Sequence, residues 1–371
     1  MQVTLIPSTD KPWDGIEVYS YELAKRLSKR NIKVIGIRVG IKDDVKYVNQ
    51  NFKLITAGTP NYTKGLGYYY RVFRAITKNY REINSSEIIH AIGGYYSAIE
   101  FIPFKGRKIV TIIGASSLRE KKKSKRIIRT IYSSLIYKFA KKYIVPNEFI
   151  YKEVKEHYHV NNLEIIPLGV DIEGLTVSER KDVLKEKLGF EPDDIVILYL
   201  GQLVHGKRLP ELLTAFKKVS EKISNAKLVL VAWGYLKDQL MELATSLNIK
   251  DRVIFKKPVP YCERKYVYGA ADVLTMIGDS FGDGGVSSAV LDGLGSGLPI
   301  IVARGSPNIL VVKDGFNGFV VNPSNPEEIA LAIMKAVENR EYLGKNSKYI
   351  AKELDWDLIA EKILKVYKEI Y

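Results

Sequence analysis

The feature that most constrains this chain is the regular alternation of short apolar segments with longer amphipathic ones. In the first half, strands are predicted at Val3–Ile6, Lys33–Arg38, Ile88–Ala91 and Lys108–Ile113, with a helix at Glu17–Arg30. In the second half, strands are predicted at Ile195–Leu200, Lys227–Val231, Val253–Phe255, Val273–Met276, Ile300–Val302 and Gly318–Val321, with helices at Leu209–Ile223 and Lys237–Leu247 and two more closing the chain. Apolar strands alternating with helices of this length indicate βαβ units and parallel sheets covered on both faces. The sequence therefore predicts an α/β protein with two Rossmann-like, doubly wound sheets.

The chain has 371 residues, which suggests two domains. A Pro/Gly break at Pro167–Asp171 is followed by the charged segment Ser178–Asp194. We therefore predict an N-terminal domain at 1–168, a C-terminal domain at 169–352, and a last helix at 353–371 that crosses back to the first domain. Doubly wound sheets bind ligands at the carboxyl ends of their strands, so two facing sheets predict a cleft between domains.

The segment with the strongest functional signals is a glycine-rich stretch, residues 278–299, which leads into a helix predicted to begin near Ser287 or Ser288. Glycines let backbone N–H groups face a ligand, and a helix N-terminus favours an anion, so the segment fits a diphosphate. Asp292, one turn inside the helix, can accept hydrogen bonds from ribose hydroxyls, and Asp283 from sugar hydroxyls. The alternative is a glycine-rich surface loop with a solvated Asp. The predicted donor-binding residues here are Asp283, Gly284, Gly285, Val286, Ser287 and Asp292.

Two further loops follow predicted strands. Gly201–Arg208 leads from a strand into a basic turn before a helix, so Lys207 or Arg208 can neutralise charge on a leaving diphosphate. Gly201 and Gln202 of this loop are also predicted to bind the donor. Near the N-terminus, Gly15 opens a helix and allows close backbone approach to a ligand. The alternatives are a basic surface turn and an ordinary turn.

Taken together, these motifs resemble those of glycosyltransferase family 4, whose members have the GT-B fold. The likeness spans nearly the whole chain, and the order and spacing of the motifs make it specific. The motifs that carry it are Asp14–Glu17, Ile88–Ala91, Ile165–Asp171, Gly201–Lys207, Asp251–Phe255, Ala270–Val273, Asp292–Pro299 and Asp355–Asp357.

This resemblance implies a retaining hexosyltransferase that uses a nucleotide-diphosphate sugar, UDP- or GDP-linked, with no metal and no other cofactor. It implies that Lys207 binds the donor diphosphate, with Arg208 beside it compensating for the family's missing Arg, while Asp283 contacts the sugar and Asp292 the ribose. Lys207, Arg208 and Asp283 are thus the predicted catalytic residues. The acceptor is predicted to be a glycan or a lipid-linked sugar that enters through the first domain.

The chain also departs from the family pattern. Asp292 stands where the family has its second Glu, and Asp283 is the best match for its first Glu. Gln202 stands where the family has Arg, and Ile113 where it has His. Eight residues, instead of seven, separate Asp283 from Asp292. Two alternatives therefore stay open: a sugar-nucleotide epimerase with this fold, and a basic binding protein without catalysis.

The formal net charge of +15 favours anionic partners, although a Lys-rich surface also serves solubility alone. The basic segment Arg119–Arg129, followed by residues 131–142, fits either an anionic membrane surface or a solvated loop before a packed helix. No nucleic-acid module is visible, so nucleic acid is not predicted as a partner.

The location predicted from the sequence is cytoplasmic, with peripheral contact at the inner membrane surface as the variant that the basic segment allows. The N-terminus lacks a signal-peptide pattern, and no apolar run approaches the ~18 residues of a membrane span. A single cysteine, Cys262, fits a reducing compartment. The four histidines lack metal-ligand spacing. Abundant Lys, Glu, Ile and Tyr with scarce Gln, Met and Cys are typical of thermophile proteins.

Overall fold

The computed structural model describes residues 1–7, 14–40, 42–58, 74, 76–93, 104–113, 140–158, 160–278 and 285–371. The chain forms two compact units. Unit 1 comprises Met1–Gly169, Gly282–Gly285 and Trp356–Tyr371, and unit 2 comprises Val170–Phe281 and Val286–Asp355. Each unit is built around its own sheet, and the two are described separately below.

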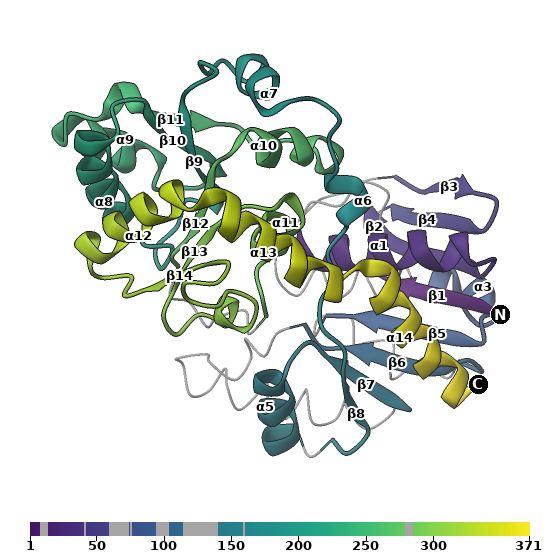
Figure 1. Ribbon diagram of the computed structural model, residues 1–371. Helices are drawn as coiled ribbons and strands as arrows, with labels where there is room; N and C mark the ends of the chain where they lie inside the picture. The colour runs from purple at the N-terminus through teal and green to yellow at the C-terminus, as the bar shows by residue number, and fades with distance from the viewer. Residues whose placement is uncertain are drawn as a thin grey trace. The chain divides into compact units, whose positions relative to one another are not determined.

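The sheet of unit 1 has the strand order β3-β4-β2-β1-β5-β6-β7-β8 (Figure 1). Its strands are β1 (Gln2–Ile6), β2 (Lys33–Gly40), β3 (Asp44–Asn49), β4 (Phe52–Gly58), β5 (Ile88–Ile92), β6 (Arg107–Thr111), β7 (Lys142–Val145) and β8 (Leu163–Ile165). All neighbours are parallel except β3 and β4. The strand order reverses between β1 and β5, which makes this pair the switch point of the sheet.

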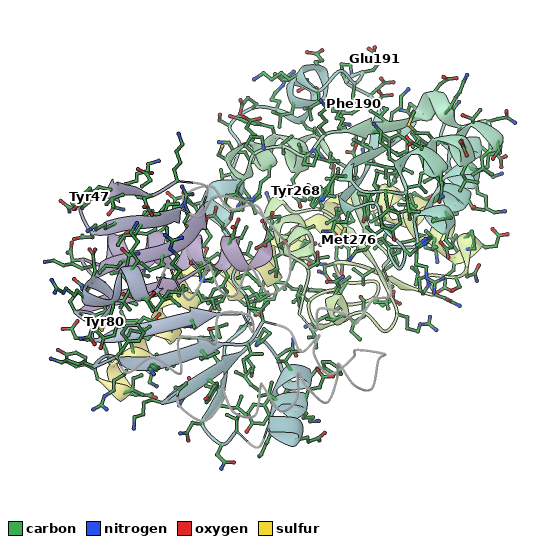
Figure 2. The ribbon with its side chains drawn as sticks, turned by 180° about the vertical axis from the view of Figure 1, so that it is seen from behind. Tyr47, Tyr80, Phe190, Glu191, Tyr268 and Met276 are labelled. Carbon is green, nitrogen blue, oxygen red and sulfur yellow. The ribbon has the colours of Figure 1, made fainter. Side chains whose placement is uncertain are left out.

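The antiparallel strand β3 departs from the purely parallel sheet expected from the sequence. Only two residues separate β3 from β4, and a connection this short can join strands only in antiparallel fashion. Strand β3 is the exposed edge of the sheet, and Figure 2 shows its Tyr47 at the periphery. Its side chains lack the apolar run that marks the buried strands, so sequence patterning does not reveal it.

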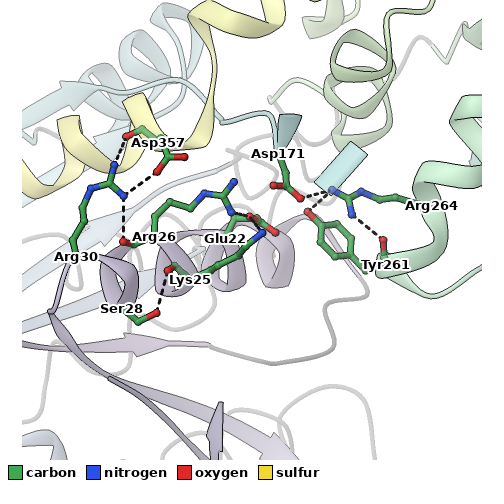
Figure 3. Close-up of polar contacts among 9 residues, drawn as sticks. All are labelled: Glu22, Lys25, Arg26, Ser28, Arg30, Asp171, Tyr261, Arg264 and Asp357. Atoms are coloured by element: carbon green, nitrogen blue, oxygen red, sulfur yellow. Dashed lines mark hydrogen bonds and ion pairs between the residues drawn. The ribbon is translucent and has the colours of Figure 1, made fainter. Parts of the chain in front are cut away.

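The helices assigned to unit 1 are α1 (Gly15–Lys29), α3 (Tyr80–Ile83), α5 (Glu148–Tyr158) and α14 (Trp356–Ile370). The apolar face of α14 is buried in one core cluster with β1 and α1, so the C-terminal helix is an integral part of this unit (Figure 1). Arg30, which follows α1, reinforces this packing: its Nη1 lies 3.0 Å from Asp357 Oδ1 and its Nη2 donates to the Asp357 carbonyl at 3.2 Å (Figure 3).

Unit 2 contains a parallel sheet with the order β11-β10-β9-β12-β13-β14. Its strands are β9 (Ile195–Gln202), β10 (Ala226–Trp233), β11 (Val253–Lys256), β12 (Val273–Met276), β13 (Ile300–Ala303) and β14 (Gly318–Val321). Its helices are α6 (Ile172–Leu175), α7 (Lys181–Lys187), α8 (Leu209–Lys222), α9 (Lys237–Ser246), α10 (Arg264–Ala270), α11 (Ser288–Ser296), α12 (Pro326–Glu338) and α13 (Arg340–Glu353). The order reverses between β9 and β12. Both sheets confirm the predicted α/β class with two Rossmann-like units.

The end of the chain differs from the two closing helices predicted, because three helices, α12, α13 and α14, follow β14. A single residue, Asn339, separates α12 from α13. Its side-chain amide donates to the Lys335 carbonyl at 2.9 Å and so closes the last turn of α12. In the described part of the chain, no helix is both long and apolar enough to cross a bilayer.

Candidate functional site

The strand pair β9 and β12 forms the switch point of unit 2, and the loops that leave both strands emerge at the same edge. A Cβ added at Gly278, just after β12, would lie 3.2 Å from the Gly206 carbonyl oxygen and 3.2 Å from Lys207 Cδ. The structure therefore brings the basic turn after β9 against the start of the glycine-rich stretch after β12. Ligands of doubly wound sheets bind in this position.

The basic turn owes its shape to two residues in the left-handed region, Gly206 with φ 84° and Arg208 with φ 55°. Arg208 is the N-cap residue of α8, and its Nη1 lies 2.9 Å from Glu211 Oε1 in the first helical turn. The positive charge of Arg208 is therefore shared with Glu211. Lys207 is half-buried beside Gly278, and Gln202 is exposed at the end of β9.

Helix α11 begins at Ser288 with Ser287 as its N-cap residue, which confirms the predicted start of this helix. The backbone N–H of Ser287 donates to Asn308 Oδ1 at 2.9 Å, so this amide already has a partner. Asn308 is buried in the short helix η6 (Pro307–Leu310). Sequence reasoning missed this contact, because Asn308 lies 21 residues further along the chain.

Two of the predicted donor-binding residues, Asp283 and Gly284, lie outside the described residues. Gly285 is assigned to unit 1, whereas Val286 belongs to unit 2. A diphosphate pocket that joins this loop to Lys207 therefore stays a prediction. The predicted basic segment, residues 119–129 and most of 131–142, also falls outside the described residues.

Asp292 lies in the second turn of α11, and its side chain is 16% exposed. Its Oδ2 accepts a hydrogen bond from Arg264 Nε at 3.1 Å. Burial raises the pKa of Asp292 to about 6, although the charge and the hydrogen bond of Arg264 act in the opposite direction. The carboxylate of Asp171 contributes to the increase. At neutral pH the Asp292 carboxylate is thus ionised and held by a buried arginine.

Arg264 is a site residue that the sequence analysis missed. Its Nη2 donates to Asp171 Oδ2 at 3.0 Å and to Tyr261 Oη at 2.9 Å, and its Nη1 donates to the Tyr261 carbonyl at 2.8 Å (Figure 3). A signal was available: Arg264 lies three and four residues before the buried Val267 and Tyr268, on the same helical face. An arginine on a buried face requires acidic partners.

Tyr268 completes the surroundings of Asp292. It lies one turn after Arg264 on α10, is buried in unit 2 (Figure 2), and its hydroxyl has no hydrogen-bond partner among the described residues. Burial and the charge of Asp292 raise the pKa of this hydroxyl, and Arg264 acts against them.

In unit 1, Gly15 is the first residue of α1, and a Cβ at this position would meet no atom within 4 Å. Asp14 caps the helix: its Oδ1 accepts from the backbone N–H groups of Ile16 at 3.0 Å and Glu17 at 2.9 Å. The carboxylate of Asp14 therefore serves the helix, while Gly15 leaves open space beside the helix start.

His90, in β5, is fully buried. Its Nδ1 lies 2.6 Å from Tyr367 Oη and its Nε2 lies 2.7 Å from Thr111 Oγ1. Burial lowers the pKa of His90 to about 3, so the ring is neutral at physiological pH. His90 is therefore a core residue with both ring nitrogens satisfied. Within the described ranges, no group of three His, Cys, Asp or Glu side chains could hold a metal ion, and the predicted independence from metal stays a prediction.

Comparison with known proteins agrees with this architecture. The family model "Glycosyltransferase Family 4" matches residues 13–173, and the model "Glycosyl transferases group 1" matches residues 180–354. An uncharacterized glycosyltransferase of Methanocaldococcus jannaschii is 30% identical over 196 residues, which are 51% of this chain and 49% of the relative. The chain thus spans about half the length of that relative.

Two solved structures share the fold over the whole chain. Sucrose-phosphate synthase from Thermosynechococcus elongatus has a TM-score of 0.81 at 18% identity, with 100% of this chain and 98% of that chain covered. Anabaena HepE in complex with UDP-glucose has a TM-score of 0.74 at 16% identity, with 100% of both chains covered. From the two family models and the shared GT-B fold, we conclude that the chain belongs to the family 4 glycosyltransferases.

Proposed function

We propose that this chain transfers a hexosyl residue from a nucleoside diphosphate sugar to a glycan or lipid-linked acceptor, with retention at the anomeric carbon. The observation that carries the proposal is the position of Lys207 beside Gly278, at the switch point of unit 2. A cation at this edge suits the diphosphate of a donor. The structure of HepE with UDP-glucose, which has the same fold, favours a UDP-sugar as the first donor to test.

In the proposed reaction, the acceptor oxygen forms a bond to the anomeric carbon while the bond from that carbon to the diphosphate oxygen breaks on the same face. The acceptor proton passes to the departing phosphate oxygen, so no side chain has to act as the base. Lys207, helped by Arg208 and by the start of α11, balances the charge that develops on the diphosphate. Asp283 would orient the sugar and Asp292 the ribose.

We place the acceptor at the carboxyl edge of the unit 1 sheet, where Gly15 leaves open space beside the start of α1. A lipid-linked acceptor would suit the basic segment, residues 119–129, and a cytoplasmic enzyme that contacts an anionic membrane surface. Vesicles with and without anionic lipid test this placement, since only the former should retain the protein at low salt.

The reaction is tested by measuring nucleotide release from UDP-, GDP- and ADP-sugars, with and without candidate acceptors. Replacing Lys207 by Gln removes one charge-assisted contact of roughly 1.5–3 kcal/mol, so kcat/KM should fall roughly 10- to 100-fold. Lys222→Gln is the matched control, because it removes the same charge from the opposite end of α8.

The rival functions give different results in the same assay. A sugar-nucleotide epimerase would interconvert the sugar without any acceptor, and a binding protein would release no nucleotide. Either result, obtained with a donor that demonstrably binds, would overturn the proposed transfer.

A further inference from the structure

We infer that Arg264 is a positioning residue that fixes the Asp292 carboxylate for the ribose hydroxyls of the donor. The inference rests on the proposed function, since it concerns the nucleoside end of the same site. Arg264 lies outside both the glycine-rich stretch and the basic turn.

The guanidinium of Arg264 contacts two carboxylates at once. Arg264 uses Nε for Asp292, at 3.1 Å, and Nη2 for Asp171, at 3.0 Å. Because the guanidinium is planar and rigid, one arginine links carboxylates from two different elements at a fixed mutual orientation. A lysine at this position would keep the positive charge but would lose the fork that reaches both acids.

The carboxylate of Asp171 is buried and closely packed. The Asp171 side chain is 3% exposed, and a Cβ added at Gly174 would lie 1.8 Å from Asp171 Oδ2. Helix α6 therefore packs directly against this carboxylate. Tyr261 adds a second anchor, because the Arg264 guanidinium carbon lies 3.5 Å from the centre of its ring. Arg264 is thus held in place independently of Asp292.

The side chains of Asp171, Arg264 and Asp292 differ in how exposed they are. The side chains of Asp171 and Arg264 are 3% and 6% exposed, whereas that of Asp292 is 16% exposed. Asp292 is therefore the member of the three that is accessible to a ligand. Such an arrangement, with two buried partners behind one more accessible carboxylate, presents acceptor oxygens in a defined direction.

The unpartnered hydroxyl of Tyr268 is an independent observation at the same place. A buried hydroxyl without a partner costs free energy and needs an explanation. Asp292 and Arg264 both influence the pKa of this hydroxyl, so Tyr268 belongs to the same buried cluster.

The test compares a nucleoside diphosphate with its 2′-deoxy and 3′-deoxy analogues, using whichever of UDP, GDP and ADP binds the wild-type protein most tightly. The wild type should prefer the ribose form by roughly 10-fold or more, since a lost hydrogen bond to a charged group is worth roughly 1.5–3 kcal/mol. In Arg264→Lys this preference should fall at least roughly fivefold, while affinity for the deoxy analogues stays within roughly twofold.

Two further variants keep the test decisive. Arg252→Lys is the matched control: Arg252 donates to the Ser220 carbonyl at 2.7 Å elsewhere in unit 2, so its replacement should leave the ribose preference unchanged. Asp171→Asn removes the ion pair that anchors Arg264 while keeping the Asp292 side chain itself, and should also reduce the preference. It serves in place of Arg264→Lys if that variant does not fold.

The outcomes distinguish a failure of the Arg264 inference from a failure of the proposed function. If ribose and deoxy forms weaken equally in Arg264→Lys, or if the preference is unchanged, Arg264 is only structural and the inference is overturned. If no nucleoside diphosphate binds the wild type at all, the proposed function itself fails. A selective loss of the ribose preference supports the inference.

Discussion

Each unit contains a buried ionisable cluster. At physiological pH the cluster of unit 1 is neutral, whereas the cluster of unit 2 is charged. In unit 1, His90 is enclosed by Thr111 and Tyr367, and burial lowers its pKa to about 3. In unit 2, burial raises the pKa of Asp292 to about 6, yet the neighbouring Arg264 makes a charged Asp292 tolerable at neutral pH. Burial disfavours the charged form in both clusters, but only the cluster of unit 2 stays charged at neutral pH.

Comparing the two clusters shows how a core residue can be distinguished from a site residue when both have shifted pKa values. The neutral His90 has a hydrogen-bond partner at each ring nitrogen and no remaining capacity for a ligand. Asp292 remains ionised and partly exposed, in the second turn of α11. A perturbed pKa marks a functional candidate only where the charge is kept and can be reached.

The largest expected effect comes from removing the buried cation. Arg264→Leu leaves Asp171 and Asp292 close together without their shared partner, and breaking a buried ion pair in this way typically costs roughly 3–5 kcal/mol. Urea unfolding should show a loss of this size. Adding Asp171→Asn and Asp292→Asn should recover part of it. A loss below about 1 kcal/mol would show that Arg264 does not hold the two acids.

The next effect should come from the neutral cluster. His90→Phe leaves the Tyr367 hydroxyl without its partner, at a cost of roughly 1–3 kcal/mol, whereas Thr111 Oγ1 keeps its contact with Tyr19 Oη at 3.4 Å. The unfolding free energy should fall accordingly, while affinity for a nucleoside diphosphate sugar stays the same. A large loss of nucleotide affinity in this variant would contradict the assignment of His90 to the core.

The pH dependence of stability should distinguish the clusters by sign. The unfolded state binds a proton at His90 near pH 6.5 but the folded state only near pH 3, so this group lowers stability as pH falls. Between pH 7 and 5 its contribution is roughly 2 kcal/mol. The folded state takes up a proton at Asp292 near pH 6 and the unfolded state only near pH 3.8, so Asp292 adds stability over the same interval.

Unfolding curves of wild type and His90→Phe at pH 7 and pH 5 isolate the contribution of His90 to the pH dependence of stability. The variant should lose less stability on acidification than the wild type. Equal losses in both proteins would mean that His90 titrates normally in the folded state.

The smallest expected effect concerns binding. If an ionised Asp292 accepts the ribose hydroxyls, affinity for UDP-glucose should decrease as pH falls through about 6, by roughly tenfold at pH 5 relative to pH 7. UDP-glucose is the suitable probe because its diphosphate carries no group that titrates in this range. Asp292→Asn should bind weakly at both pH values. A pH-independent affinity in the wild type would contradict the ribose assignment.

Sequence patterning predicted the six strands of unit 2 and four strands of unit 1 from their apolar runs, but it missed the buried strands β4 and β7. The predicted Val273–Met276 has the same bounds as β12, and the predicted Ile195–Leu200 lies within β9. The exposed edge strand β3 and the short helix α6 have no such run, and the sequence analysis did not find them.

The candidate site was only partly accessible from sequence for a different reason. The basic turn and the glycine-rich stretch each follow a strand, so the switch-point rule brings them together. The contacts of Arg264 depend on the convergence of α6, α10 and α11, which are distant in the sequence. Their packing has no local signature beyond an arginine on an apolar helical face.

We propose that the edge at β9 and β12 of unit 2 binds the diphosphate of a nucleotide sugar. It is tested most directly by calorimetric titration of UDP-, GDP- and ADP-sugars into the wild type, Lys207→Gln and Lys222→Gln. We predict that at least one donor binds the wild type, that Lys207→Gln weakens it roughly 10- to 100-fold, and that Lys222→Gln leaves it unchanged. Equal affinity in Lys207→Gln and the wild type, or no binding of any donor, would contradict the account.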